Sequence, residues 1–390
     1  MLSGVAFCIA VGFGVMAPIL PLYAREYGAS GFLIGLLFGA LSVFRLLTMP
    51  FAGVFLRRIG PRELAIIGAV MNAVPTALIG LADAYWQMVL FRGLSGVGSA
   101  LFGVSSMSLL FASAPPELQG RANSAFSGGF VLGGMAGPTL GGLLSGISLQ
   151  FPFYFYGAML IAAAVVLFIF LPSAAPHRDD AASKPPVAVW QAFRDSRFRA
   201  TLAVSFVNGW QSNGVRALIV PLFVVEALHR STISTGVAFA LAAATQAASM
   251  PLIGWAVDRL GRRTLMLAGA AIAAVTGTLF LLANSFLSLV VLLCVYGIGA
   301  AATATASQAL LADTVPPTAG GALSAFQMSG DAGLIIGPMV AGLLIDLWSM
   351  HIAVFVGSLL FVVAGVMAWR TPRDAAPMIR QTPGPDTYPE

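Results

Sequence analysis

Four ionisable side chains lie inside long apolar stretches of this chain: Arg45, Arg92, Arg216 and Asp331. A charge within a membrane-spanning helix costs about 3 kcal/mol on insertion scales, so such residues usually have a function in binding a substrate or in moving ions or protons. Three of the four are cationic, and no acidic residue falls in the interior of an apolar segment of the first half. A cavity lined by these residues would be electropositive, which favours neutral or anionic amphiphiles over cations.

The densest polar run within an apolar segment is NGWQSNGVR, residues 208–216. Helical spacing cannot turn all of these side chains away from lipid, so several must face a cavity or another helix. On an earlier segment, Arg92, Ser95 and Ser99 recur on one helical face. Trp210 and Tyr296 would either stack on a ligand or pack within the bundle. The expected substrate contacts are Arg92, Ser95, Ser99, Asn208, Trp210, Gln211, Ser212, Arg216 and Tyr296.

The elements that carry these residues are apolar helices. The chain has 390 residues, 58% hydrophobic and 9% charged, whereas soluble domains carry about 25% charged residues. A spanning helix needs ~20 predominantly apolar residues, and twelve segments qualify. They are residues 2–24, 31–55, 64–83, 85–112, 119–146, 151–172, 200–228, 232–257, 264–284, 286–312, 319–346 and 350–370.

The polar stretch 173–199 divides the chain into two halves of six segments each. The sequence predicts an all-α membrane protein with two six-helix bundles, residues 1–172 and 200–370. Residues 173–199 form a cytoplasmic linker, and the Pro-rich residues 371–390 form a disordered cytoplasmic tail. Most arginines fall in loops on the side of both termini, and only Arg25 and Arg230 fall in loops on the other side, which predicts cytoplasmic termini.

The two halves repeat one another. Gly53 matches Gly254, and Gly96 matches Gly297, both at an offset of 201 residues. From Ser124, which matches Ser324, the offset is 200. Six spans per repeat keep both halves in the same orientation, so a cavity between them can open to either side of the membrane in turn.

Three motifs carry a family resemblance. The repeated loops GVFLRRIGPR (53–62) and GWAVDRLGRR (254–263), the stretch RGLSGVGSA from Arg92, and GGMAGPTLGG (133–142) resemble motifs of the major facilitator superfamily. The last of these is similar to a fifth-helix pattern of the twelve-helix drug:proton antiporter branch. The resemblance implies the fold of two pseudo-symmetric six-helix bundles. Exporters of organic cations in that branch usually place a carboxylate within the first half, and this chain does not.

The Gly-Pro pairs of the fifth and eleventh spans have two interpretations. A proline inside a helix kinks it, and small residues let neighbouring helices approach closely. The alternative is a direct part in preventing leak. The residues concerned are Gly133, Gly137, Pro138, Gly337 and Pro338.

The loop repeat reverses one charge, since Arg57 in the first half stands where the second half has Asp258. In the resembled family the loop aspartate sits against the start of a gate helix in the opposite half, where the helix dipole favours an anion. We expect Asp258 to pair with Arg121, and Arg57 with Asp313, in a cytoplasmic gate that includes Gly53 and Gly254. The alternative is a decayed motif in which Arg57 is simply solvated.

Arg45 and Asp331 lie at similar depth from the same membrane face, about 18 and 16 Å at the helical rise per residue. The second and eleventh helices pack together in the resembled fold, which would make these residues an ion pair between the bundles. Protonation of Asp331 would break that pair and couple protons to transport. The alternative is a permanent structural pair.

Together these features predict a secondary active transporter of the bacterial inner membrane that exports small neutral or anionic amphiphiles in exchange for protons. The alternative is a facilitator or proton symporter for a sugar or an organic anion. An enzyme is not expected, because His177, His229 and His351 all fall in loops or the linker. The expected partners are a small-molecule substrate, protons and the lipid bilayer, and we expect a monomer that binds no nucleic acid. Cys8 and Cys294 have no ligand spacing, so no metal or cofactor is expected.

Overall fold

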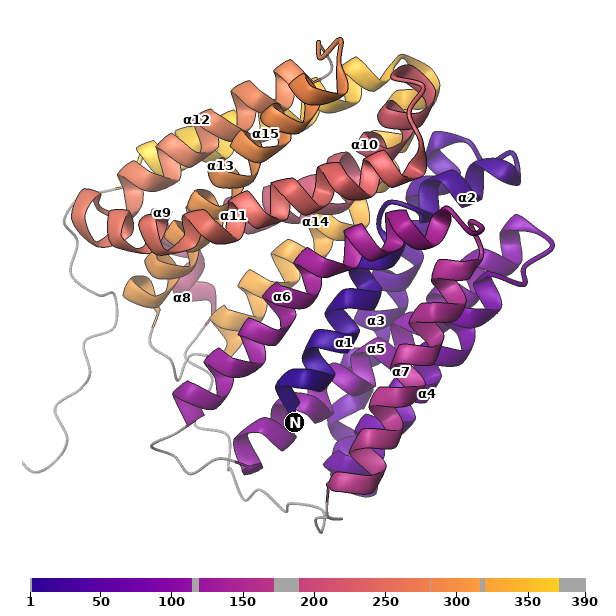
Figure 1. Cartoon of the computed structure of the whole chain (residues 1–390). Coiled ribbons are helices and arrows are strands. Elements are labelled where there is room, and N and C mark those ends of the chain that lie inside the picture. The colour runs from indigo at the N-terminus through magenta and orange to yellow at the C-terminus, as the bar shows by residue number, and fades with distance from the viewer. Residues whose placement is uncertain (1, 114–118, 172–188, 281, 316–319, 372–390) are drawn as a thin grey trace, which may run out of the picture.

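The computed structural model describes residues 2–113, 119–171, 189–280, 282–315 and 320–371, and all of its regular elements are helices (Figure 1). The first half contains α1 (Leu2–Met16), α2 (Leu20–Glu26), α3 (Gly31–Ile59), α4 (Pro61–Ile79), α5 (Tyr85–Ser113), α6 (Gln119–Ser145) and α7 (Phe151–Phe170). The second half contains α8 (Val189–Arg194), α9 (Ser196–Trp210), η2 (Gln211–Ile219), α10 (Val220–Leu222), η3 (Phe223–Ala227), α11 (Thr232–Leu260), α12 (Arg262–Phe280), α13 (Phe286–Thr314), α14 (Gly320–Leu347) and α15 (Met350–Trp369).

The helices follow the predicted apolar segments closely. Within the described residues, nine helices are long and apolar enough to cross a membrane, and α1 with α2 forms a tenth candidate bent by 42°. The other two predicted spans, 119–146 and 200–228, coincide with α6 and with the run from α9 to η3. The second of these spans is not one regular α-helix, because η2 and η3 are π-helical. Most of the predicted linker and tail lies outside the described residues.

Matching turns occur in the two halves where the loop motifs repeat. Gly60 ends α3 with φ of 98°, and Gly261 ends α11 with φ of 84°. These backbone conformations are strained for residues with a Cβ atom, so glycine at the eighth position of each motif is explained by the turn. The next helix begins at once in both halves, at Pro61 and Arg262.

The helices form two groups that meet along two seams. In the first group α1 packs on α6, and α5 packs on α3 and α4; in the second group α14 packs on α9, and α13 packs on α11 and α12. Between the groups, α3 packs on α14 and α6 packs on α11. From the end of the molecule where α2 and α10 lie, the two groups diverge (Figure 1).

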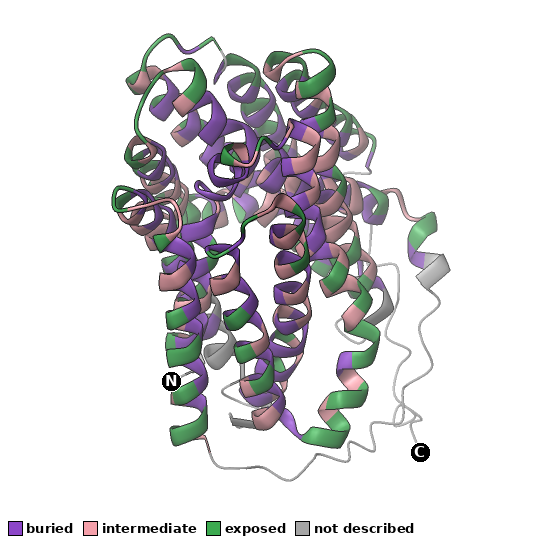
Figure 2. Ribbon diagram, turned by 90° about the vertical axis from the view of Figure 1, so that its right-hand side faces the viewer, coloured by how far each residue is buried: buried purple, intermediate pink, exposed green. Residues whose placement is uncertain are grey.

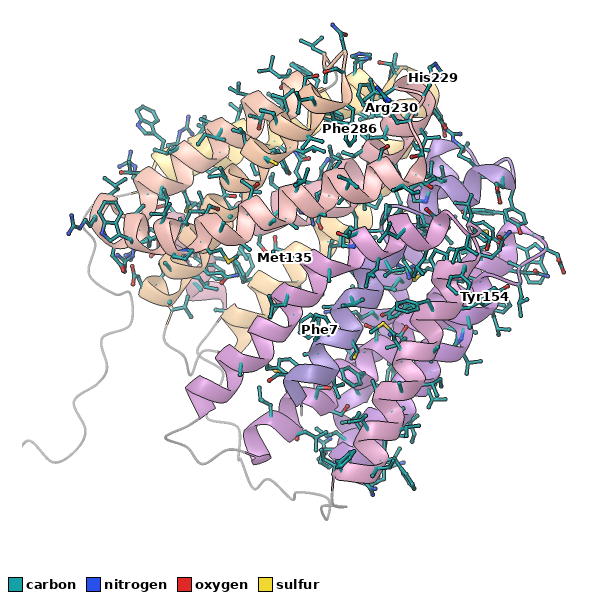
Figure 3. The ribbon with its side chains drawn as sticks, viewed as in Figure 1. Phe7, Met135, Tyr154, His229, Arg230 and Phe286 are labelled. Atoms are coloured by element: carbon teal, nitrogen blue, oxygen red, sulfur yellow. The ribbon has the colours of Figure 1, made fainter. Side chains whose placement is uncertain are left out.

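We call the end near α2 and α10 the closed face and the opposite end the open face. At the closed face, backbones of the two halves touch: a Cβ atom added at Gly31 would lie 2.6 Å from the Gly342 carbonyl oxygen, and one at Gly142 would lie 2.8 Å from Gly236 Cα. His229 and Arg230 lie in the turn after η3 at this face (Figure 3). Towards the open face, a Cβ atom added at Gly53 or Gly254 would have no neighbour within 4 Å.

The outward helix surfaces are apolar, as contact with lipid requires. Large hydrophobic side chains such as Phe168, Leu252 and Leu287 are more than 60% exposed. Buried residues gather between the helices, whereas exposed residues lie on their outer sides (Figure 2). Most hydrophobic side chains that a soluble protein would bury can therefore face the bilayer here.

Candidate substrate cavity

A cavity of about 130 Å³ lies between the two halves. Its walls combine two guanidinium groups and a few polar side chains with three phenylalanine rings, and none of the described residues that line it is an aspartate or glutamate. The lining residues are Phe13, Gly14, Ala17, Phe38, Arg92, Gly134 and Pro138 from the first half, and Ser212, Asn213, Arg216, Ala217, Phe239, Ala242 and Ala243 from the second. Arg92 and Arg216 therefore give the described lining of this cavity its positive charge.

Arg92 enters the cavity wall from α5 and is only 3% exposed. Its Nη1 atom lies 3.6 Å from Met16 Sδ, a weak acceptor, and its Nε atom has no hydrogen-bond partner among the described residues. None of the ion pairs found in the described part of the chain includes Arg92. Because an unpaired buried cation is costly, a ligand that supplies an anion or a strong acceptor would stabilise this residue.

The second-half wall is formed by η2 together with α11. A π-helix closes its turns with i→i+5 hydrogen bonds and occurs mainly at functional sites; here the Val220 N–H donates to the Val215 carbonyl. This geometry brings Ser212, Asn213 and Arg216 to the cavity. Arg216 is exposed, unlike Arg92 across the cavity. Its side chain therefore remains hydrated while facing the same space.

Three of the predicted substrate contacts, Arg92, Ser212 and Arg216, line the cavity. The others do not line it in this conformation. Ser95 is fully buried and its hydroxyl donates to the Arg92 carbonyl at 2.8 Å, while Ser99 is half-buried on the same helix. Tyr296 instead borders a small separate void beside Arg216.

The remaining expected contacts on the seventh span face other helices. The Gln211 side chain lies against α15, where a Cβ atom at Gly357 would be 3.0 Å from its Nε2 atom. Asn208 Oδ1 accepts a hydrogen bond of 3.4 Å from the Thr303 hydroxyl. Trp210 is 4% exposed and packs on Gly337 of α14. The prediction placed Gln211 and Ser212 near one face, but of the two only Ser212 lines the cavity.

Asn213 and the phenylalanines Phe13, Phe38 and Phe239 also line the cavity but are not among the predicted contacts. Asn213 lies three residues before Arg216, a spacing that shares a helix face, so the sequence could have indicated it. The phenylalanines lie on apolar segments rich in phenylalanine, and no spacing distinguishes them from lipid-facing rings. The polarity of residues 208–216 is the sequence feature that indicates this part of the cavity wall.

Arg45 and Asp331 lie just beyond the last close contact between α3 and α14. A Cβ atom at Gly35 would meet the Pro338 backbone, and one at Gly39 would lie 3.5 Å from the Ile335 carbonyl. The next turns towards the open face carry Arg45 on α3 and Asp331 on α14, each half-buried. No hydrogen bond or ion pair joins them in the described structure, so their pairing remains a prediction for a conformation in which these turns approach.

The predicted gate residues lie at the open face, where the halves diverge. Arg57 and Asp258 are both exposed. Asp313 forms an ion pair of 2.8 Å with Arg262 of its own half rather than with Arg57. The side chain of Arg121 lies outside the described residues. The gate of Asp258 with Arg121 and Arg57 with Asp313 therefore remains a prediction for a conformation closed at this end.

The glycines of the two Gly-Pro motifs lie at helix contacts. Added Cβ atoms at Gly133 and Gly137 would lie 2.7 Å from Ala10 Cβ and Gly14 Cα of α1, respectively. One at Gly337 would lie 2.7 Å from Trp210 Cα. Pro138 lies inside α6 and lines the cavity, and Pro338 lies inside α14. These positions match the packing interpretation of the motif.

Comparisons with known proteins agree with this architecture. The family model of the Major Facilitator Superfamily matches residues 2–218 and again residues 201–388. The chain is 24% identical over 372 residues to an uncharacterized MFS-type transporter of Methanocaldococcus jannaschii, covering 93% of this chain and 95% of that protein. It is 26% identical over 166 residues to the quinolone resistance protein NorA of Staphylococcus aureus, a match that covers 42% of each protein.

Solved structures share the fold at lower identity. An inward-facing, occupied bacterial homolog of the human lysosomal transporter Spinster gives a TM-score of 0.80 at 17% identity and covers 94% of both chains. The nucleoside transporter NupG gives a TM-score of 0.76 at 14% identity and covers 94% of this chain and 97% of its own. With two matching repeats that span nearly the whole sequence, this chain belongs to the major facilitator superfamily of multi-pass membrane transporters.

Proposed function

We propose that this protein is a secondary active transporter that exports small neutral or anionic amphiphiles in exchange for protons. The observation that carries the proposal is the cavity wall, in which Arg92 and Arg216 face one space and none of the described lining residues carries a carboxylate. The rings of Phe13, Phe38 and Phe239 offer an apolar surface to the rest of a ligand. Such a site attracts an anion or a polar neutral group and repels a cation.

Export is supported by the partial match to the quinolone resistance protein NorA. The proposed proton-binding residue is Asp331, a half-buried acid in the middle of α14 beside the seam with α3. The second candidate function, uptake of a sugar-like or anionic solute, is favoured by the shared fold of NupG, a nucleoside transporter. We propose transport as a monomer, with no catalytic step.

We propose the bacterial inner membrane as the location, with the open face towards the cytoplasm. Both ends of the α3–α4 turn carry arginines, Arg58 and Arg62, and the equivalent α11–α12 turn carries Arg259 and Arg263. An excess of basic residues in short loops is retained on the cytoplasmic side of a membrane. In that orientation the described conformation faces inward.

A matched set of probes tests the proposal. Purified protein in liposomes is given an imposed pH gradient and offered 1-naphthoate, 1-naphthamide or the trimethylammonium derivative of the same ring system. We expect gradient-driven transport of the naphthoate or the naphthamide and none of the cation. Transport of the cation alone would refute the argument from the cavity, whereas transport of any probe that ignores the pH gradient would favour the facilitator.

A further inference from the structure

One carboxylate crosses between the two halves at the closed face. Asp346, near the end of α14, accepts a hydrogen bond from the Gly31 N–H at 2.7 Å and another from the Phe32 N–H at 2.8 Å. The Ser30 side chain also interacts with it. Ser30 is the N-cap of α3, and Gly31 and Phe32 are its first residues. Since the first N–H groups of a helix have no partner within it, Asp346 satisfies two of them from the opposite half.

The packing of α14 on α3 explains why Asp346 reaches this position. Gly342 lies one helical turn earlier, and its backbone touches the Gly31 backbone so closely that neither position has room for a Cβ atom. Residues four apart in a helix share a face, so residue 346 is placed beside the start of α3. A negative charge there is also favoured by the positive end of the helix dipole.

A second contact ties the halves beside this one. Arg25, at the end of α2, forms an ion pair of 3.1 Å with Glu226 of η3 and donates from Nη1 to the Ala29 carbonyl at 3.0 Å. Arg25 also acts electrostatically on Asp346. Arg25 and Glu226 are side chains that are 33% and 41% exposed, so solvent weakens their attraction. Asp346 is exposed as well, but it accepts two bonds from backbone N–H groups that have no partner within α3.

The pseudo-symmetric seam lacks such a carboxylate. At the offset of 200 residues, Asp346 corresponds to Gly146, which follows α6. The helix start opposite is that of α11, where the N-cap Ser231 forms no side-chain capping bond. The halves are joined there by a neutral hydrogen bond of 2.7 Å from the Ser145 hydroxyl to the Thr232 hydroxyl. Of the two seams, the α3–α14 seam is therefore the one that a charged side chain bridges within the described residues.

We propose that Asp346 is the latch of the closed face, and that release of the α3 start by Asp346 is the step that opens this face during transport. Asp346 does not line the cavity, so it is a positioning residue that sets the balance between conformations rather than a substrate contact. The predicted latch of the open face, Asp258 against the start of α6, lies on the other seam. The two carboxylates, both from the second half, would hold opposite faces of the transporter in turn.

Cysteine accessibility measures this balance directly and needs no knowledge of the substrate. In a Cys8→Ala/Cys294→Ala background, Ser212→Cys places a thiol in the cavity, and a membrane-impermeant maleimide is applied to sealed vesicles from either side. We expect Asp346→Ala to raise the labelling rate from the closed-face side by about tenfold, since a hydrogen bond to a charged group typically contributes at least that much. Asp346→Glu should restore part of the latch.

Asp83→Ala is the matched control, because Asp83 is an exposed acid in the turn between α4 and α5 at the same face. If Asp346→Ala changes the sidedness of labelling no more than this control does, the latch is refuted. Should Asp346→Ala fail to fold, Gly146→Asp in the otherwise unchanged reporter gives a second test. It places a carboxylate at the pseudo-equivalent seam, and we expect slower labelling from the closed-face side; unchanged or faster labelling would also refute the proposal.

Discussion

At the scale of single residues, Arg92 has the most unusual environment in the described structure. It is 3% exposed, its Nη1 atom contacts the Met16 thioether, and its Nε atom has no hydrogen-bond partner among the described residues. Retaining such a group lowers stability, because a buried charge without a partner is more costly than an apolar residue of similar size. Arg216 carries the same charge on the opposite wall, but it is exposed and carries little of this cost.

The difference between the two arginines leads to a prediction about Arg92→Met. Transport of 1-naphthoate should fall at least about tenfold, since hydrogen bonds to charged groups contribute roughly 1.5–3 kcal/mol. The melting temperature of the purified protein should rise, because the substitution removes an unpaired buried charge. Arg216→Met is the control: it should reduce naphthoate transport without the gain in melting temperature. A lowered melting temperature for Arg92→Met would show that this charge is paired in the folded protein.

The proposed proton site gives a second prediction at the same scale. Asp331→Asn keeps the size and polarity of the side chain but cannot release a proton at physiological pH. We expect the variant to equilibrate substrate across liposomes without accumulating it against a gradient when the pH gradient is imposed. Asp83→Asn, at the exposed turn, should leave accumulation unchanged. Undiminished proton-driven accumulation by Asp331→Asn would remove this residue from the coupling mechanism.

At the scale of helices, the contact of α1 with α6 depends on glycines at four-residue spacing. Gly133, Gly137 and Gly141 each bring the α6 backbone against a carbonyl oxygen of α1, those of Phe7, Val11 and Val15. In membranes, such close approach replaces the hydrophobic driving force that helices lack in lipid. The motif that suggested an antiporter branch therefore also has a clear packing role.

Two alanine substitutions in α6 separate packing from helix propensity. At Gly137 a Cβ atom would lie 2.7 Å from Gly14 Cα, whereas at Gly134 it would meet nothing within 4 Å. Gly137→Ala should destabilise the protein by about 1–3 kcal/mol through overpacking. Gly134→Ala should be neutral or slightly stabilising, because alanine is the better helix former. Thermal unfolding in detergent compares the two variants, and equal melting temperatures would contradict the packing interpretation.

At the scale of the whole molecule, the described conformation joins the halves at one end only. Within the residues that the structure describes, the hydrogen bonds and ion pairs found between the halves all lie at the closed face, and they include those of Asp346, Arg25 and Ser145. The predicted partners at the other end, Arg57 and Asp258, are exposed. Alternating access requires these two sets of contacts to form in turn.

A disulfide across the closed face should stop the alternation between the contacts of the closed face and those of the open face. The Ser145 and Thr232 hydroxyl oxygens are 2.7 Å apart, so cysteine side chains at these positions would face one another across the seam. In the Cys8→Ala/Cys294→Ala background, oxidised Ser145→Cys/Thr232→Cys should lose transport, and a reductant should restore it. Each single cysteine variant serves as the control. Continued transport by the fully oxidised protein would mean that this seam does not open during the cycle.

Much of the architecture follows from the sequence alone. Length, apolar patterning and the glycines of the two loop motifs determine the helices, the two-fold repeat and the tight turns at Gly60 and Gly261, because each is a local requirement of the backbone or of the bilayer. Arg92 and Arg216 are also identifiable as cavity candidates from the sequence alone, because an ionisable residue in an apolar span is costly and is usually functional.

The tertiary structure alone decides which polar side chains share the cavity and which face is closed. Gln211 and Asn213 belong to one short polar run, yet the structure places Gln211 against α15 and Asn213 at the cavity. These positions depend on how η2 packs against α14 and α15, which no local pattern reports. Asp346 likewise looks like an ordinary acid near a helix end. It gains its bonds to α3 only because Gly342 and Gly31 bring two distant helices into backbone contact.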